Sequence, residues 1–441
     1  TQGYSSAASD VYKRQELIWI YNNKWQICYT YVKISFMDKN KSISTQKNNR
    51  WDVVYFILYG IVLAKCVYET TMFSQQVLVG TFKLFLAAMV LYTGAKVLFS
   101  GYYSRKEQLA IAVVILIFGI VGLQTGYYEL LQPVLLIVGA KNVRFDNILK
   151  VYTAVVSVML IVAAIASQTG VIADVIGYSP RNAAAARHSY GIIYPTDFAA
   201  HIFYLILAVS CLGIWKRVQE NEKYRYTAWL RWLIVIAAAV FIYIKAGAFT
   251  GTVCLTGFLV LMGLIYLLEK KNLARRVCEI FKYLPVVWAS LFLALSYFYS
   301  ESNAVMLKID SVLSQRLMVS HKVWSEYSVK LFGQFIEEQG WGGVADPTGI
   351  DPAKYFFIDD MYLRMLFEYG IIVFAVVLIL LIFIGHKAIG AKQYVLFAAI
   401  VMIGVHSFME HHLLEVAYNP FMLVLLAGID TADKEKSGRK I

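Results

Sequence analysis

Three cationic side chains border or interrupt long apolar stretches of the chain. Arg187 comes just before an apolar segment, Lys245 lies in a tight turn between two more, and Arg316 lies in the polar stretch 301–365. Guanidinium groups bind phosphate oxygens through paired hydrogen bonds and stabilise the charge of a departing phosphate. Together the three cations predict a site for a dianionic pyrophosphate. The alternative is snorkelling toward lipid phosphates, with Asp197 as a further possible partner for Arg187.

Two adjacent carboxylates, Asp359 and Asp360, occur where the chain returns from the polar stretch to an apolar segment. A carboxylate at this point can take a proton from an attacking hydroxyl group as a general base. The structural alternative is a helix cap, because Asp accepts hydrogen bonds from the free amides of a helix N-terminus. Tyr362 is a weaker candidate in the same segment.

Apolar residues recur at helical spacing between 313 and 331, which predicts an amphipathic helix. At 100° per residue, Arg316 falls at one edge of the apolar stripe and His321 at the other, well away from it. Arg316 is therefore the stronger candidate and His321 a weaker one, with a solvated position as the alternative for both. His188, beside Arg187, is a further weaker candidate.

The turn Glu410-His-His412 holds three titratable side chains, and Glu410 and His411 are weaker site candidates. Adjacent histidines on a turn rarely converge on one ion without further ligands, so we expect no metal. The chain has no glycine-rich phosphate loop, Ser-His-Asp signature or zinc motif, and we expect no cofactor.

The composition places these residues in an integral membrane protein. Of the 441 residues, 59% are hydrophobic and 16% are charged, far from the balance of a soluble domain. The net charge of +12 reflects Lys and Arg in alternate short connections, as the positive-inside rule requires, and we expect no nucleic-acid partner.

The apolar pattern predicts an all-α polytopic membrane protein with about twelve transmembrane helices. The expected spans are 52–68, 76–98, 108–123, 127–140, 147–168, 195–215, 226–244, 249–268, 282–300, 366–385, 393–409 and 413–429. Lys and Arg place both termini in the cytoplasm, and the long loops 169–194 and 301–365 outside.

This count divides the chain into an ordered series of regions. Residues 5–15 resemble a translated sequencing-adapter fragment, and residues 1–36 are expected to be a non-native extension. The remaining regions are a cytoplasmic N-terminus (37–51), transmembrane helices 1–9 (52–300), the large outer loop (301–365), transmembrane helices 10–12 (366–429) and a cytoplasmic tail (430–441).

With these motifs in this order, the chain resembles the O-antigen polymerase and ligase superfamily of membrane glycosyltransferases. It is most similar to the polymerases of capsular and exopolysaccharide repeat units, over about residues 50–430. The motifs that carry the resemblance are Arg187-His-Ser-Tyr-Gly191, Tyr194-Pro-Thr-Asp197, Gln315-Arg316, Leu331-Phe-Gly333, Asp359-Asp-Met-Tyr-Leu363, Glu410-His-His412 and Tyr418-Asn-Pro-Phe421.

The resemblance implies a lipid-linked glycosyltransferase architecture of the GT-C type, in a bacterial plasma membrane. The implied substrate is an oligosaccharide carried on undecaprenyl pyrophosphate, held by Arg187 and Arg316. Lys245 stands where the family often has Arg. Ligases commonly have His-Asn where this chain has Asp359-Asp360, which favours a polymerase over a ligase.

The expected activity is therefore metal-independent, inverting polymerisation of repeat units at the outer face of the membrane. The expected partners are the lipid-linked substrate, the bilayer, a flippase and a chain-length regulator. One alternative is a ligase that moves finished glycan to an acceptor. Another is a secondary transporter or flippase, but the chain shows no internal repeat and no long central cytoplasmic loop.

Overall fold

The computed structural model describes residues 50–75, 82–179, 182–215, 229–340 and 356–429. This part of the chain is mostly helical, and seven of its helices are long and apolar enough to cross a membrane. The prediction of a helical membrane protein is thus confirmed. The expected extension at 1–36, the N-terminal region at 37–49 and the tail at 430–441 lie outside the described residues.

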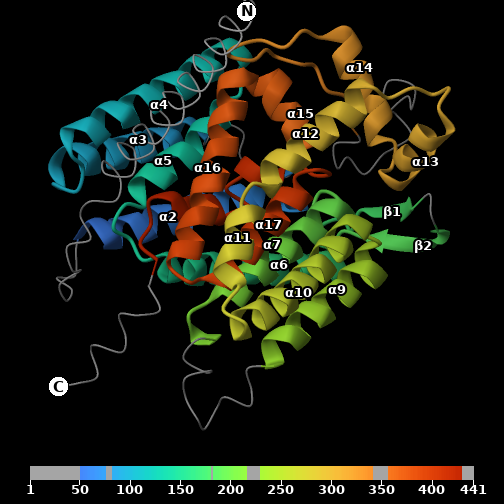
Figure 1. Cartoon of the computed structure of the whole chain (residues 1–441), viewed down its shortest axis with the longest axis horizontal. Helices are drawn as coiled ribbons and strands as arrows, with labels where there is room; N and C mark the ends of the chain where they lie inside the picture. The colour runs from blue at the N-terminus through green and yellow to red at the C-terminus, as the bar shows by residue number, and fades with distance from the viewer. Residues whose placement is uncertain (1–49, 76–81, 180–181, 216–228, 341–355, 430–441) are drawn as a thin grey trace, which may run out of the picture. The chain divides into compact units, whose positions relative to one another are not determined.

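The helices follow the apolar segments closely in most of the chain (Figure 1). The expected span 127–140 is a 3₁₀ turn followed by a helix of only 9 residues. The helices are α2 (Arg50–Glu69), α3 (Phe82–Phe99), α4 (Arg105–Thr125), α5 (Leu131–Gly139), α6 (Phe145–Gln168), α7 (Pro195–Cys211), α9 (Leu230–Ala246), α10 (Phe249–Lys270), α11 (Ala274–Phe281), α12 (Leu284–Tyr297), α13 (Ala304–Val312), α14 (Arg316–Glu326), α15 (Met361–Arg364), α16 (Gly370–Gly390) and α17 (Tyr394–His406).

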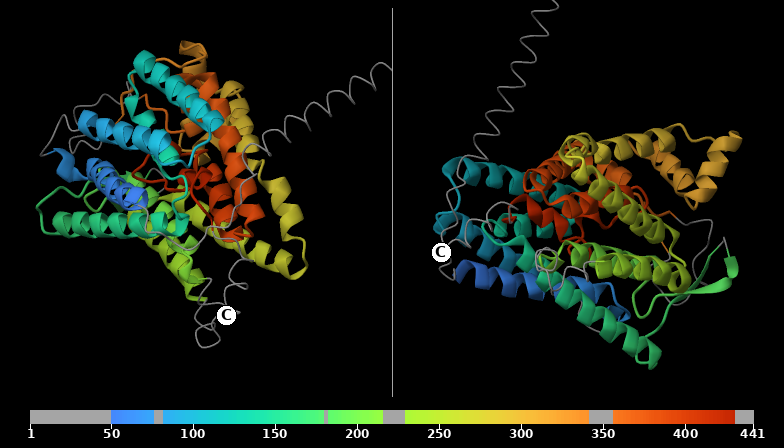
Figure 2. Two further views of the ribbon diagram at one scale, coloured as in Figure 1. Left: turned by 90° about the vertical axis from the view of Figure 1, so that its left-hand side faces the viewer. Right: turned by 60° about the horizontal axis from the view of Figure 1, so that its bottom comes forward.

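A contact between helix ends shows that α6 and α7 run in opposite directions. The Gly213 amide, just after α7, donates to the Asp146 carboxylate in the first turn of α6 at 2.7 Å. At the opposite end, the Arg187 guanidinium donates to the carbonyl of Ala246, the last residue of α9. Figure 2 shows α16 beside the yellow helices α11 and α12, which it contacts. The start of α6 and the end of α7 therefore lie together at one end of the bundle, and Arg187 and the end of α9 lie together at the other.

The predicted last span, 413–429, is not a regular helix. The chain instead forms two 3₁₀ turns, His412–Leu414 and Phe421–Leu425. Pro420 lies in the middle of this segment, where it removes an amide donor and opposes a continuous helix. The Gly428 amide then donates to the Val143 carbonyl at 2.7 Å, so the segment still runs from the turn after α17 to the connection before α6.

Backbone groups of this irregular segment are satisfied by neighbouring helices. The ammonium group of Lys387 on α16 donates to the carbonyls of Val424, Leu425 and Ala427 at 2.7, 3.2 and 2.6 Å. The Asn419 amide donates to the Leu413 carbonyl at 2.7 Å. Non-helical backbone at membrane depth is tolerated where protein covers it, and most residues of the segment are buried.

A β-hairpin in the polar stretch 169–194 was not predicted from the sequence. Strand β1 (Ile176–Ser179) pairs antiparallel with β2 (Asn182–His188). Asp174 fixes its base by accepting the amides of Ser189 and Tyr190 at 3.0 and 2.9 Å. The hairpin ends beside the start of α7 and presents Arg187 to the α9–α10 turn.

The polar stretch folds back onto α12 and the start of α15. Helix α14 packs against α12 and buries Leu317, Ser320 and Val323. Beyond it, Gly333 and Gly370 meet with so little space that a Cβ on Gly333 would overlap the Glu368 carbonyl. Residues 341–355 of the predicted outer loop lie outside the described residues.

Candidate functional site

The site is centred on Arg316, the first residue of α14. Asp310 fixes the start of this helix, because its carboxylate accepts the Leu317 amide at 2.8 Å. The Arg316 Nη2 atom lies 3.1 Å from Glu410 Oε1, and its Nε atom lies 3.4 Å from Asp359 Oδ2. Only 14% of the Arg316 side chain is exposed, so both carboxylates act on it with little screening by water.

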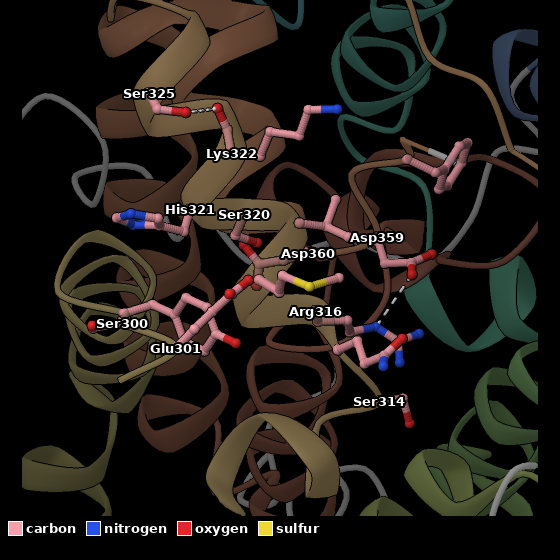
Figure 3. A pocket seen from close by; sticks show the side chains of 15 residues that line it. Ser300, Glu301, Ser314, Arg316, Ser320, His321, Lys322, Ser325, Asp359 and Asp360 are labelled. Carbon is pink, nitrogen blue, oxygen red and sulfur yellow. Dashed lines mark hydrogen bonds and ion pairs between the residues drawn. The ribbon is translucent and has the colours of Figure 1, made fainter. Parts of the chain in front are cut away.

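Arg316 and Asp359 line a cavity of about 760 Å³, within the range of small-molecule sites. In Figure 3 the two side chains point toward each other. Most of the residues that line the cavity have polar side chains, and they come from the segment after α12, from the start and length of α14 and from the approach to α15. They include Ser300, Glu301, Ser314, Gln315, Arg316, Ser320, His321, Lys322, Ser325, Asp359 and Asp360.

Asp360 caps a helix, which is the structural alternative considered for it from the sequence. Its carboxylate accepts the Leu363 amide at 2.6 Å and caps α15. Burial raises the pKa of Asp360 well above its ordinary value. Tyr362 is fully buried, and its hydroxyl donates to the Gly404 carbonyl at 2.6 Å, so it joins α15 to α17. Asp359 is thus the carboxylate with the better access to the cavity, since its side chain is 24% exposed.

Arg187 approaches the same carboxylate cluster from the β-hairpin. Its Nε atom donates to the Ala246 carbonyl at 2.9 Å, and its aliphatic part packs over Gly247. Burial raises the pKa of Glu410, while the guanidinium groups of Arg316 and Arg187 act in the opposite direction. Glu410 therefore lies within electrostatic range of both arginines.

Lys245 lies one residue from the Arg187 contact but is exposed. Lys245 is in the last turn of α9, which ends at Ala246, and α10 begins at Phe249 after a short connection. The exposed ammonium group of Lys245 at this end of α9 can contact a ligand that enters beside the helix. The contacts of the described residues do not bring it to Arg316.

Two of the weaker histidine candidates, His188 and His321, have different surroundings. His188 Nδ1 lies 2.7 Å from Asp174 Oδ2, at the base of the hairpin. His321 lines the same cavity as Arg316. They lie on opposite sides of Ser320 in Figure 3, and the cavity extends around the exposed face of α14 to reach both. His321 Nδ1 donates to the Ser296 carbonyl at 3.0 Å, which makes Nε2 the acceptor of the neutral ring.

The Glu410-His-His412 turn packs beside this site and folds back on itself. His412 is buried, and its ring stacks on Tyr418 with centroids 3.9 Å apart. Burial lowers the pKa of His412, but Glu415, Asp197 and Glu410 outweigh burial and raise it to about 9. Burial and the neighbouring His412 lower the pKa of His411.

Sequence reasoning did not single out two sets of residues. Glu415 accepts from His412, with 3.3 Å between Oε1 and Nδ1. Arg364 is buried between Glu338 and Glu368, at 2.8 and 3.0 Å. A signal for the second set was present, because Arg364 and Glu368 are spaced i,i+4 within an apolar segment, where unpaired charges are costly.

No family model, curated protein or solved structure matches the chain.

Proposed function

We propose that the chain is a membrane glycosyltransferase that polymerises oligosaccharide repeat units carried on undecaprenyl pyrophosphate. One observation carries the proposal: a buried arginine, Arg316, is held by Asp359 and Glu410 at the wall of a polar cavity. The approach of Arg187 to Glu410 supplies a second guanidinium. Two guanidiniums beside a carboxylate that can accept a proton suit the transfer of a group from a pyrophosphate.

The proposed setting is the outer face of a bacterial plasma membrane, with the chain crossing twelve times in a GT-C-type arrangement. The opposite directions of α6 and α7 support alternate crossings, and the proposed count takes the irregular segment 413–429 as the last crossing. Lys and Arg in alternate connections then lie in the cytoplasm. The cavity at Arg316 faces the outside, where repeat units are assembled.

In the proposed reaction, Arg316 and Arg187 hold the pyrophosphate of one lipid-linked unit, with Lys245 guiding its entry. A hydroxyl of the second unit attacks the anomeric carbon, and a new glycosidic bond forms as the bond to the pyrophosphate oxygen breaks. Asp359 accepts the hydroxyl proton, and lipid pyrophosphate leaves with the bonding electrons. Because attack and departure occur on opposite faces, the anomeric configuration inverts. Asp360 positions Asp359 by capping α15.

The test uses the full chain in membranes supplied with a purified lipid-linked repeat unit and no other acceptor. Polymer is expected from the wild type, because donor and acceptor are the same molecule. R187A and R316A should each reduce polymer at least about 100-fold while single units persist, the size of effect seen when transition-state charge stabilisation is removed. R276A is the matched control, because Arg276 is an exposed cation on α11, at the opposite end of the bundle.

Two results would count against the proposal. If R187A and R316A both still made polysaccharide of normal length, the assignment of this site would be wrong. A wild-type protein that consumes the donor only after a different acceptor is added would be a ligase, the nearest alternative.

A further inference from the structure

The turn that follows α17 brings three metal-ligating side chains to one point. His411 Nε2 and His412 Nδ1 each lie 3.3 Å from the same atom, Glu415 Oε1. One ligand atom from each residue falls within 4.8 Å of the other two. The sequence offered only the adjacent histidines, and the 3₁₀ turn His412–Leu414 supplies the missing third ligand by folding Glu415 back over them.

Two of the three spacings fit a small divalent cation, and the two histidine nitrogens, which lie within 4.8 Å of each other, would move closer together as the ion binds. Ligand atoms about 2.0–2.1 Å from Zn²⁺ at the tetrahedral angle lie about 3.3 Å apart. A charge-assisted hydrogen bond between the same groups would be shorter, about 2.7–2.9 Å. The two measured distances to Glu415 thus match edges of a tetrahedron better than they match ion pairs.

The surroundings of His412 provide an independent indication. Its Nε2 atom is buried and has no hydrogen-bond partner among the described residues. The nearest acidic group is Asp197 on α7, with 3.8 Å between Nε2 and Oδ1. A histidine that binds metal through one nitrogen usually directs its other N–H to a carboxylate, which fixes the ring. Stacking on Tyr418 also fixes it.

We propose that His411, His412 and Glu415 bind one zinc-like divalent cation, with Asp197 orienting His412 and the fourth position open. His411 and Glu415 are 22% and 38% exposed in their side chains, which leaves a path for the ion to enter. The bound ion fixes the turn that carries Glu410, the partner of Arg316. The site is separate from the transfer chemistry proposed above, so either proposal can fail alone.

The test measures binding directly on the full chain, purified in detergent and stripped with a chelator. One Zn²⁺ per chain is expected by elemental analysis after dialysis, together with a raised thermal midpoint. Co²⁺ in the same site should give the visible absorption of a tetrahedral complex. H411Q and E415Q should lose the bound ion and the spectrum, and D197N should weaken binding about 10–100-fold.

H386Q is the matched control, because His386 and Glu279 form a similar pair, 3.3 Å apart, at the other end of the bundle. It should bind Zn²⁺ like the wild type. Wild-type protein that binds no Zn²⁺ above the level of E415Q overturns the proposal whatever the variants do. So does loss of the ion in H386Q alone. Because H411Q and E415Q alter partly exposed side chains, an unchanged gel-filtration profile will separate lost binding from lost folding.

Discussion

Arg316 and Glu410 are 94 residues apart in the sequence, yet their side chains meet with 3.1 Å between Nη2 and Oε1. The contact joins the polar stretch to the turn after α17 and holds the guanidinium at the cavity wall. The position of Arg316 thus depends on a residue in a different part of the chain.

E410Q should lower both stability and transfer activity. Removing the negative charge weakens a mostly buried, charge-assisted hydrogen bond, on the order of 2 kcal/mol. A thermal melt of the detergent-purified protein would show a lower midpoint. The control is E326Q, because Glu326 pairs with Lys322 at an exposed site and should change stability by less than about 0.5 kcal/mol. Equal midpoints for E410Q and wild type would contradict the role given to this contact.

D359N and D360N should separate the proton acceptor from the helix cap. Asn caps a helix about as well as Asp, so D360N keeps α15 in place and retains most of the activity. D359N removes the carboxylate that faces the cavity and should reduce polymer formation at least about 100-fold. Initial rates with the lipid-linked repeat measure both. If D359N kept full activity and D360N was folded but inactive, the general base would be Asp360 and not Asp359.

The stability difference between wild type and D360N should depend on pH. Burial raises the folded-state pKa of Asp360, with Arg316 acting to lower it and Asp359 to raise it. A raised pKa contributes stability that is complete below about pH 4, the unfolded value, and is lost as pH rises through the folded value. Asn does not titrate, so D360N should gain stability relative to wild type from about pH 4 upward. Parallel melting midpoints across the pH series would refute this.

K387M should loosen the irregular segment without unfolding the helices around it. The substitution leaves three carbonyls without their donor, each worth roughly 1–3 kcal/mol when buried. We expect a cysteine placed at Leu425 to react faster with a thiol reagent in K387M than in the wild-type background. K270M, at an exposed position that ends α10, is the control and should leave the labelling rate unchanged.

G333A should be far more damaging than G101A. Both glycines have positive φ, +78° and +72°, so both substitutions incur backbone strain of about 1 kcal/mol. At Gly333 the new Cβ also overlaps the Glu368 carbonyl, whereas at Gly101 it meets open space. The difference between their thermal midpoints isolates the close approach of residues 333 and 370. Similar losses in both variants would show that this approach is easily relieved.

Hydropathy was sufficient to predict most of the helices, because lipid-facing and core-facing residues are both apolar and the spans are long. It failed at 413–429, where apolar residues face protein on all sides and Pro420 prevents a helix. The hairpin at 176–188 was also missed, because its second strand is a run of alanines without the β-branched residues that favour strands.

The site could be predicted only in part, because its contacts join segments that are far apart in the sequence. Helical phase placed Arg316 toward the protein, which its low exposure confirms. Phase within one helix cannot give contacts with another segment, so the pairing with Glu410 could not be predicted. Helical phase also could not show that one cavity extends to both Arg316 and His321. Glu415 was not predicted as a site residue, because its carboxylate comes close to the two histidines only when the turn is folded.

The hydrogen bonds of Phe145 and Gly428 have a consequence for how the protein is made. The Phe145 amide donates to the Gly428 carbonyl at 2.9 Å, so α6 begins against a residue synthesised almost 300 positions later. When α6 leaves the ribosome, the segment that will fill the space beside it does not yet exist. Helices inserted early therefore lack the packing partner that fills the space between them. This space is filled only when the last part of the chain has been translated. Maturation of this protein is therefore expected to end with a packing step after insertion, at a moment when the partly assembled helices are most open to chaperones and proteases.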